Sequence, residues 1–203
     1  MQSKSLNRSV EFFDTQFQRQ SALQEYVLNP FETAVLPFLS GRVLDFGCGM
    51  GNLAVAAARS GCEVTALDAS PAAIADLAKR AAASALRIEA RVADLRNDSI
   101  DEGRYDCVVS IGLLMFFPQS LAQAALQHIR SAVPPGGLAA VNVLIEGTTF
   151  MGMFDPPDYY LFQESDLPDM FTDWIVEYLK LDTLPAPGDT IKRFCTIAAR
   201  RPC

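Results

Sequence analysis

The sequence predicts an α/β domain: a doubly wound, mostly parallel sheet with helices on both of its faces. Short apolar runs alternate with helical segments between residues 41 and 145, which is typical of βαβ units. A glycine-rich turn follows the first apolar run, and an aspartate stands at or just beyond the end of each of the first three runs. Because open sheets of this kind bind ligands at the carboxyl ends of their strands, the same stretch also predicts a ligand site.

The length and composition favour one globular domain. Half of the 203 residues are hydrophobic, which is enough for a single core and does not require a second domain. The net charge is −7 and the basic residues form no extended cluster, so we expect no nucleic-acid partner. No apolar run approaches the roughly 18–20 residues that cross a bilayer, so we expect no membrane association.

The cysteines and the histidine bear on location and metal binding. The five cysteines have no paired spacing, and residues 1–5 lack the apolar core of a signal peptide. We therefore expect a reducing, cytoplasmic location. With a single histidine and scattered cysteines, the sequence predicts no transition-metal site.

The first predicted strand, residues 43–46, runs into three alternate glycines, Gly47, Gly49 and Gly51. Alternate glycines leave room for a ligand beside the backbone, and the helix predicted over 53–59 directs its free N–H groups toward the same turn. The turn therefore suits a ligand with a carboxylate or a phosphate. The alternative is a tight connection between strand and helix that binds nothing.

Two details favour a ligand without phosphate. Dinucleotide-binding turns have the spacing G-x-G-x-x-G, whereas this turn has G-x-G-x-G, with Asn52 at the position of the third glycine. Asp45, at the end of the strand, would repel a pyrophosphate but can accept hydrogen bonds from an ammonium group. S-adenosylmethionine (SAM) carries an amine, a carboxylate and a sulfonium but no phosphate. We therefore expect SAM at this turn, in contact with Asp45, Gly47, Cys48, Gly49 and Asn52.

A second aspartate fits the ribose of SAM. Asp68 follows the strand predicted over 62–67 and lies 23 positions after Asp45, close to the distance expected for an acid that binds ribose hydroxyls. The alternative is that Asp68 only leads into the cap of the next helix. Ser70 and Pro71 already supply that cap, which favours the ribose role.

A third aspartate fits the adenine ring. Asp94 follows the strand predicted over 86–92 and can accept a hydrogen bond from the adenine amine, while the backbone N–H of Leu95 can donate to a ring nitrogen. Asp94 can instead cap the turn at 96–99. The expected contacts to the adenosyl group are Asp68, Ala69, Asp94 and Leu95.

The fourth predicted strand, residues 105–110, leads into the apolar run 111–117. Because this run lies at the carboxyl end of a strand, we expect Ser110 and Met115 to contact the cofactor, with Met115 beside the adenine ring and the methyl-transfer position. The alternative is that the run is simply core of the next connection.

Two segments flank this core. Residues 1–40 are predicted to be helical, either as a cap over the sheet edge or as a lid to which Phe13, Phe17 or Arg19 contributes. Residues 146–162 have no clear period and are rich in phenylalanine, methionine and tyrosine. Connections of this length inside a compact domain are usually functional, so we expect a lid on the acceptor side.

The D-x-G-x-G-x-G pattern at 45–51, the acids after three strands and the P-P-G-G at 134–137 resemble the class I SAM-dependent methyltransferases. The resemblance covers residues 41–145 and implies a Rossmann-like fold. Its seven-stranded version ends in an antiparallel hairpin, which fits strands predicted over 174–181 and 191–199. One domain, 1–203, then comprises a helical lid (1–40), a SAM-binding core (41–145), and an acceptor-side lid with the C-terminal hairpin (146–203).

Within this superfamily the chain is most similar to the TehB-type tellurite-resistance methyltransferases. The similar stretches are 113–117, 162–164 and 193–200. In that family the loop before the last strand brings a His-Arg pair and a further arginine that are proposed to handle the oxyanion. The corresponding loop here, 183–189, has neither histidine nor arginine, which argues against tellurite as the substrate.

The resemblance implies an enzyme that transfers the SAM methyl group to a small-molecule acceptor and releases S-adenosylhomocysteine (SAH). A soft nucleophile, such as a thiol or a selenium or tellurium oxyanion, needs no strong base, and the sequence offers no obvious one. For an amine or hydroxyl acceptor, the available proton acceptors are Tyr159, Tyr160 and Glu164. The rival functions are a non-catalytic SAM-binding module and, disfavoured by the glycine spacing, an NAD-dependent oxidoreductase.

Overall fold

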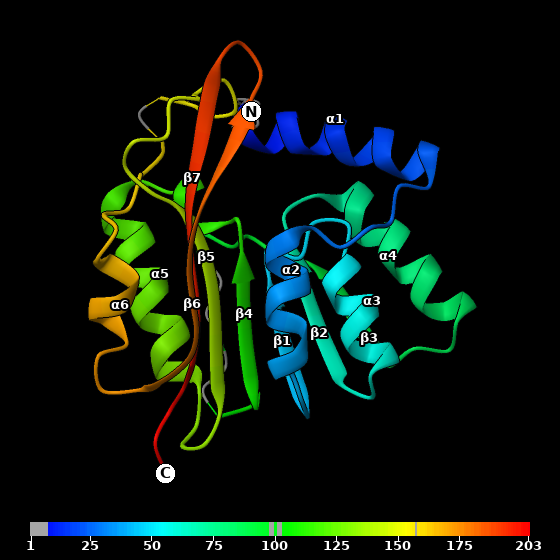
Figure 1. The fold of residues 1–203 in the computed structure, drawn as a ribbon. Helices are drawn as coiled ribbons and strands as arrows, with labels where there is room; N and C mark the ends of the chain where they lie inside the picture. Colours follow the sequence, from blue (N-terminus) through cyan, green and yellow to red (C-terminus); the bar gives the residue numbers. More distant parts are fainter. Residues whose placement is uncertain (1–7, 98–99, 101–102, 157) are drawn as a thin grey trace.

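In the described part of the chain, seven strands form one sheet in the order β3-β2-β1-β4-β5-β7-β6 (Figure 1). The structure, a computed structural model, describes residues 8–97, 100, 103–156 and 158–203. Residues 1–5, considered above for a signal peptide, lie outside the described residues. The strands are β1 Arg42–Phe46, β2 Glu63–Asp68, β3 Ile88–Val92, β4 Cys107–Ile111, β5 Leu138–Leu144, β6 Ile175–Ala186 and β7 Thr190–Arg200.

Strands β1 to β5 are parallel, and their order reverses between β1 and β4. Asp45 of β1 is paired with Ala66 of β2 on one side and Val109 of β4 on the other. At such a switch point the connections leave toward opposite faces of the sheet and open a crevice at the carboxyl ends of the strands. The predicted doubly wound, Rossmann-like sheet is confirmed, and Asp45 lies at its switch point.

Helices cover both faces of the sheet. Helices α2, α3 and α4 pack on one face and α5 and α6 on the other, while α1 extends across the top of Figure 1, above the carboxyl ends of the parallel strands. The helices are α1 Arg8–Leu23, α2 Pro30–Val35, α3 Asn52–Arg59, α4 Pro71–Ala83, α5 Gln119–Ala132 and α6 Asp166–Met170, with 3₁₀ turns η1 Leu36–Phe38 and η2 Leu114–Phe116.

The local sequence explains where the helices next to the crevice begin. Ser70 caps α4, since its Oγ accepts the N–H of Ala73 at 3.2 Å and Pro71 occupies the first turn, as expected from the sequence. Asn29 and Glu32 form a capping box at the start of α2. Each device satisfies N–H groups that a helix start leaves free.

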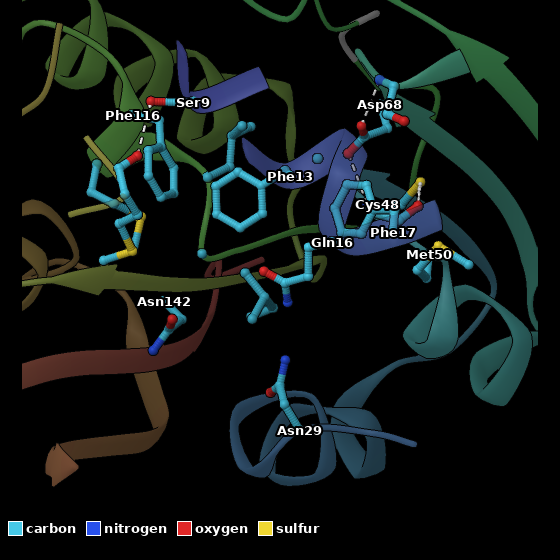
Figure 2. A pocket seen from close by; sticks show the side chains of 18 of the residues that line it. Ser9, Phe13, Gln16, Phe17, Asn29, Cys48, Met50, Asp68, Phe116 and Asn142 are labelled. Carbon is cyan, nitrogen blue, oxygen red and sulfur yellow. Dashed lines mark hydrogen bonds between the residues drawn. The ribbon is translucent and has the colours of Figure 1, made fainter. Parts of the chain in front are cut away.

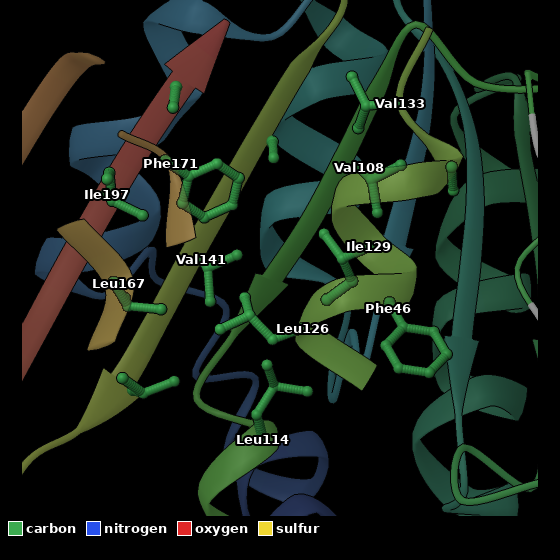
Figure 3. Close-up of a cluster of buried hydrophobic side chains, with 14 of the residues drawn as sticks. Phe46, Val108, Leu114, Leu126, Ile129, Val133, Val141, Leu167, Phe171 and Ile197 are labelled. Carbon is green, nitrogen blue, oxygen red and sulfur yellow. The ribbon is translucent and has the colours of Figure 1, made fainter. Parts of the chain in front are cut away.

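The core beneath α5 and α6 is apolar and fully closed (Figure 3). Leu126 and Ile129 of α5 lie against Val141 of β5, and Phe171, which ends α6, joins the same cluster. All four side chains are at most 1% exposed. This face of the sheet therefore supports the fold, and because α2, α3 and α4 pack on the opposite face, the strand ends remain for a site.

The C-terminal hairpin is longer than the sequence predicted. Strand β6 runs to Ala186 and includes Pro185, where a strand ending near 181 was expected. Proline is tolerated because β6 is an edge strand, so the position needs no N–H donor toward a further strand. A register shift lies between Val176 and Tyr178.

None of the described helices is both long enough and apolar enough to span a membrane.

Candidate functional site

A cavity of about 830 Å³ lies at the carboxyl ends of β1, β2, β4 and β5, between α1 and α2 (Figure 2). In this view Asp68 and Cys48 stand at one end and Phe116 and Asn142 at the other, with Phe13 of α1 between them. The cavity therefore occupies the switch point of the sheet, and α1 covers it. Among the predicted cofactor contacts it is lined by Asp45, Gly47, Cys48, Gly49, Asn52, Asp68, Ala69, Asp94, Leu95 and Met115.

The glycine turn forms one wall and has no room for side chains. Gly47 and Gly49 have φ angles of +86° and +52°, which side chains disfavour. A Cβ on Gly47 would come within 2.8 Å of Leu113, and one on Gly49 within 3.1 Å of Phe17. The backbone therefore faces the cavity directly. Cys48 also lines the cavity, and burial raises the pKa of its thiol well above the usual value. The thiol therefore stays protonated and does not serve as a nucleophile.

Asp45 is a buried acid with an unpartnered oxygen. Asp45 is 3% exposed, and its Oδ2 has no hydrogen-bond partner among the described residues. Burial, together with repulsion from Glu32 and Asp68, raises the pKa of Asp45 to about 8. A buried polar atom without a partner costs free energy, so this carboxyl group is suited to a ligand that brings a hydrogen-bond donor.

Asp68 lines the cavity and also braces the turn. Its Oδ2 accepts the N–H of Gly49 at 2.8 Å, and its Oδ1 accepts the N–H of Ser70 at 2.8 Å. Burial raises its pKa in spite of these hydrogen bonds. A carboxylate oxygen can accept more than one bond, so the carboxylate can hold the turn and still receive ribose hydroxyls.

Asp94 combines the two positions considered for it. It lines the cavity, and its carboxylate also accepts from the backbone N–H of Arg96 at 3.2 Å and from Asn97 Nδ2 at 2.8 Å. Residues 98–99, the rest of the turn that Asp94 was considered to cap, lie outside the described residues. Leu95 is buried beside it and lines the cavity.

Two other predicted contacts differ in position. Met115, in η2, is 2% exposed and lines the cavity, whereas Ser110 is fully buried and does not line it. Successive residues of a strand face opposite sides. Ser110 lies on the same face of β4 as Val108, which packs under α5. The next residue, Ile111, lies on the other face and lines the cavity. We therefore leave Ser110 out of the proposed cofactor contacts.

Helix α1 and the segment after β5 close the cavity. Phe13 lies edge-on to Phe116, with ring centroids 4.9 Å apart, and Phe17 lies over the glycine turn. Ser9 donates to the carbonyl of Met153 at 3.2 Å, which joins α1 to the segment after β5. Helix α1 therefore lies over the cavity, a position compatible with the lid considered for residues 1–40.

The three candidate proton acceptors lie outside the cavity. Tyr159 stacks on Phe154 with ring centroids 4.8 Å apart, the Tyr160 hydroxyl donates to Asp166 at 2.9 Å, and Glu164 pairs with Arg193 at 3.0 Å. None of the three lines the cavity. All three residues belong to the irregular segment before α6. Because that segment has no period, the sequence pattern could not place their side chains.

Several lining residues were missed by sequence reasoning, and two of them are Asn142 and Lys192. Asn142 is 1% exposed on β5; its Nδ2 donates to Thr196 Oγ1 at 2.8 Å, and its Oδ1 has no partner among the described residues. A polar residue within the apolar run 138–144 was the available signal. Lys192 on β7 also lines the cavity, but nothing in the sequence brought that strand to the site.

The hydrogen-bond acceptors that line the cavity fit SAM. Asp45 Oδ2 and Asn142 Oδ1 are buried oxygens that need donors, and the glycine wall accepts a ligand against bare backbone. SAM supplies an ammonium group, hydroxyls and an adenine amine. In the described residues, no group of three or more histidine, cysteine, aspartate or glutamate side chains is arranged to hold a metal ion.

Comparisons with known proteins agree with this geometry. Residues 43–137 match the family described as a methyltransferase domain. Hemagglutinin 1 of Eikenella corrodens is 27% identical over 79% of this chain, which spans only 55% of that protein's length. A ubiquinone biosynthesis O-methyltransferase of Xanthomonas campestris pv. campestris is 26% identical over 74% of this chain and 68% of its own length. The solved structure of TehB from Haemophilus influenzae superposes with a TM-score of 0.74 at 20% identity, over 95% of this chain and 67% of TehB.

The likeness to TehB concerns the fold, and the domain match concerns the residues that form the glycine turn and the walls beside it. Residues 43–137 thus match a methyltransferase domain, and over most of its length the chain shares the fold of a solved SAM-dependent methyltransferase from Methanosarcina mazei, which superposes with a TM-score of 0.64 at 19% identity.

Proposed function

We propose that this protein transfers the methyl group of SAM to a small-molecule acceptor, and that it does so in the cytoplasm. The observation that carries the proposal is the unpartnered Asp45 Oδ2, buried beside a bare glycine turn at the switch point of the sheet. The methyltransferase domain and the relative named as an O-methyltransferase support it. The free cysteines are compatible with a reducing compartment.

The proposed contacts divide the cofactor among the strand ends. Asp45 receives the ammonium group, Asp68 the ribose hydroxyls, and Asp94 with the Leu95 N–H the adenine edge. The bound cofactor supplies an activated methyl group on a good leaving group, so the chain has chiefly to align the acceptor and exclude water. Alignment of the acceptor and closure of the cavity fall to Phe13 of α1 and to the side chains clustered with it, namely Met115, Phe116 and Met153.

The acceptor end favours a nucleophile that needs no strong base. The titratable groups lining the described cavity are carboxyl groups, Cys48, Lys192 and Arg96, with no histidine or tyrosine among them. Asn142 Oδ1 is an acceptor that can orient an incoming X–H group but cannot take its proton at neutral pH. A thiol or another soft nucleophile meets these conditions. Tellurite is disfavoured, because the hairpin turn carries no histidine or arginine.

Calorimetry and methyl transfer test this function and its rivals. We expect SAH to bind at one site and NAD not to bind; tight NAD binding without SAH binding rejects the proposal. Methyl-labelled SAM is then incubated with thiols, amines, selenite and tellurite. Label should enter a small organic acceptor. Good SAH affinity with no transfer to any acceptor would favour a non-catalytic SAM-binding module.

A further inference from the structure

Lys192 stands at the end of the cavity farthest from the glycine turn. Lys192, Phe194 and Thr196 lie at every second position of β7 and so share one face of the strand. In the register, Phe194 pairs with Leu144 of β5 and Thr196 with Asn142. Lys192, Phe194, Leu144 and Asn142 all line the cavity. In the sheet, β7 is three strand spacings from β1, which is about 14 Å. The lysine therefore belongs to the acceptor end of the cavity.

The ammonium group of Lys192 has no carboxylate partner among the described residues. Its recorded contact is with the ring of Phe150, whose centroid lies 4.7 Å from Nζ. Burial lowers the pKa of Lys192, with no neighbouring acid to oppose the effect. By contrast, Lys180 on β6 pairs with Asp182 at 2.6 Å. A partly buried cation without a counter-ion is costly unless something compensates it.

The other cation of the cavity is already engaged. Arg96 pairs with Asp158 at 2.9 Å and donates to the carbonyl of Phe116 at 3.1 Å. Lys192 is therefore the positive group that remains for a ligand within the described lining of the cavity.

The acidic groups lie toward the other end. Asp45, Asp68 and Asp94 belong to β1, β2 and the segment after β3, and Glu32 of α2 lies near enough to Asp45 to raise the pKa of that carboxyl group. The cavity is thus acidic where the cationic cofactor is proposed to bind and cationic where the acceptor enters. This charge separation favours an acceptor of negative charge.

The space near Lys192 is apolar and aromatic. Phe31 of α2 and Phe194 lie with ring centroids 4.4 Å apart, and Phe150, Met153 and Leu144 complete the walls. A small inorganic oxyanion would leave these walls uncovered. A flat organic body buries apolar surface against them.

We propose that the methyl acceptor is an organic acid with an aromatic or otherwise apolar body, whose anionic group binds Lys192 while the body lies among Phe31, Phe150 and Phe194. This inference rests on the proposed function, because it assigns the cofactor to the opposite end. It names the acceptor class for that same cavity.

Binding of matched acid and amide probes to the SAH-saturated protein tests the inference. The probes are 2-naphthoate and 2-naphthamide, which differ in charge but hardly in shape, and sodium selenite represents a small oxyanion. We expect naphthoate to bind about tenfold more tightly than naphthamide, the size of one charge-assisted hydrogen bond. Selenite should bind more weakly than naphthoate.

Variants assign that preference to one side chain. Lys192→Met should abolish the preference for the acid and leave naphthamide binding intact, and Lys192→Arg should keep most of it. Lys180→Met, at an ion-paired lysine on the outer strand, is the matched control and should change nothing. SAH affinity, measured first in each variant, should equal that of the wild type and shows that the fold is intact.

The outcomes separate the two proposals. Absence of SAH binding by the folded wild type rejects the proposed function. Normal SAH binding overturns only this inference if naphthoate has no advantage over naphthamide, if neither naphthyl probe binds, if the advantage survives in Lys192→Met, or if selenite binds more tightly than naphthoate.

Discussion

At the scale of single residues, the buried carboxyl group of Asp45 dominates the electrostatics of the site. Its pKa of about 8 lies far above the ordinary value of 3.8, first because of burial and then because of Glu32 and Asp68. The folded, ligand-free protein therefore holds a proton on Asp45 that the unfolded chain has lost between pH 3.8 and about 8. The contribution of Asp45 to the free energy of unfolding therefore falls as pH rises through that window.

Substitution Asp45→Asn tests this description. Because the ammonium group of SAH favours ionised Asp45, wild-type SAH affinity should rise with pH, by up to about tenfold per unit below pH 8. Asp45→Asn should bind SAH more weakly and lose this part of the pH dependence. Its ligand-free form should gain stability relative to the wild type near pH 8. Calorimetric titrations and denaturant unfolding at several pH values measure both quantities, and identical pH profiles for the two proteins would refute the assignment.

Some residues of the site were predictable and others were not, for a physical reason. Asp45, Asp68 and the glycines lie next to strand ends in the sequence, so local pattern is enough to place them at the crevice. Lys192 reaches the cavity only because β7 is inserted beside β5. That pairing is a tertiary contact between segments about fifty positions apart, and no local period reports it.

At the scale of elements, α1 is held over the cavity by side chains of α4. Asp76 accepts from Ser21 Oγ at 2.7 Å, from Tyr26 Oη at 2.9 Å and from Arg80 Nε at 2.7 Å. Burial opposes ionisation of Asp76, but these hydrogen bonds outweigh it and lower its pKa. Asp76 is therefore one polar fastening of this region to α4, beside the hydrogen bond that Ser70 donates to Asp14 of α1 at 2.5 Å.

Loss of that carboxylate should loosen the lid. For Asp76→Ala we expect the opening free energy of α1 to fall by about 1–3 kcal/mol, the cost of stranding its hydrogen-bond donors. Faster hydrogen exchange confined to α1, with weaker SAH binding, is the expected result. Asp173→Ala removes the partner of Arg130 on the opposite face and serves as control. Equal exchange in both variants would show that Asp76 does not hold α1.

The elements also show where sequence patterns end. The alternation between residues 41 and 145 predicted five strands and the helices between them. Burial of one side of a strand or helix gives its hydrophobic residues a regular spacing, which can be seen in the sequence. The end of β6 was misplaced, since Pro185 reads as a turn unless the strand is known to lie at the sheet edge. Tyr159 and Tyr160 belong to a segment without period, so their distance from the cavity had no signal in the sequence.

At the scale of the whole molecule, most of the core under α5 and α6 lies away from the cavity at the carboxyl ends of the strands. Leu126 belongs to the core under α5 and α6, is 1% exposed and does not line the cavity. Leu126→Ala should therefore lower the free energy of unfolding by about 2–5 kcal/mol, while the SAH affinity of the folded protein stays unchanged. Leu179→Ala, at a position 47% exposed on β6, should cost no more than about 0.5 kcal/mol. A loss of SAH affinity in Leu126→Ala would contradict this separation.

The account depends on one cavity that receives an adenosyl amino acid between acidic strand ends. A crystal structure of the protein with SAH tests this most directly. The account predicts the ribose hydroxyls on the Asp68 carboxylate, the amino group against Asp45 Oδ2, and the sulfur facing the aromatic end that holds Asn142. An empty cavity, or SAH bound elsewhere with Asp68 still accepting only from Gly49 and Ser70, would contradict it.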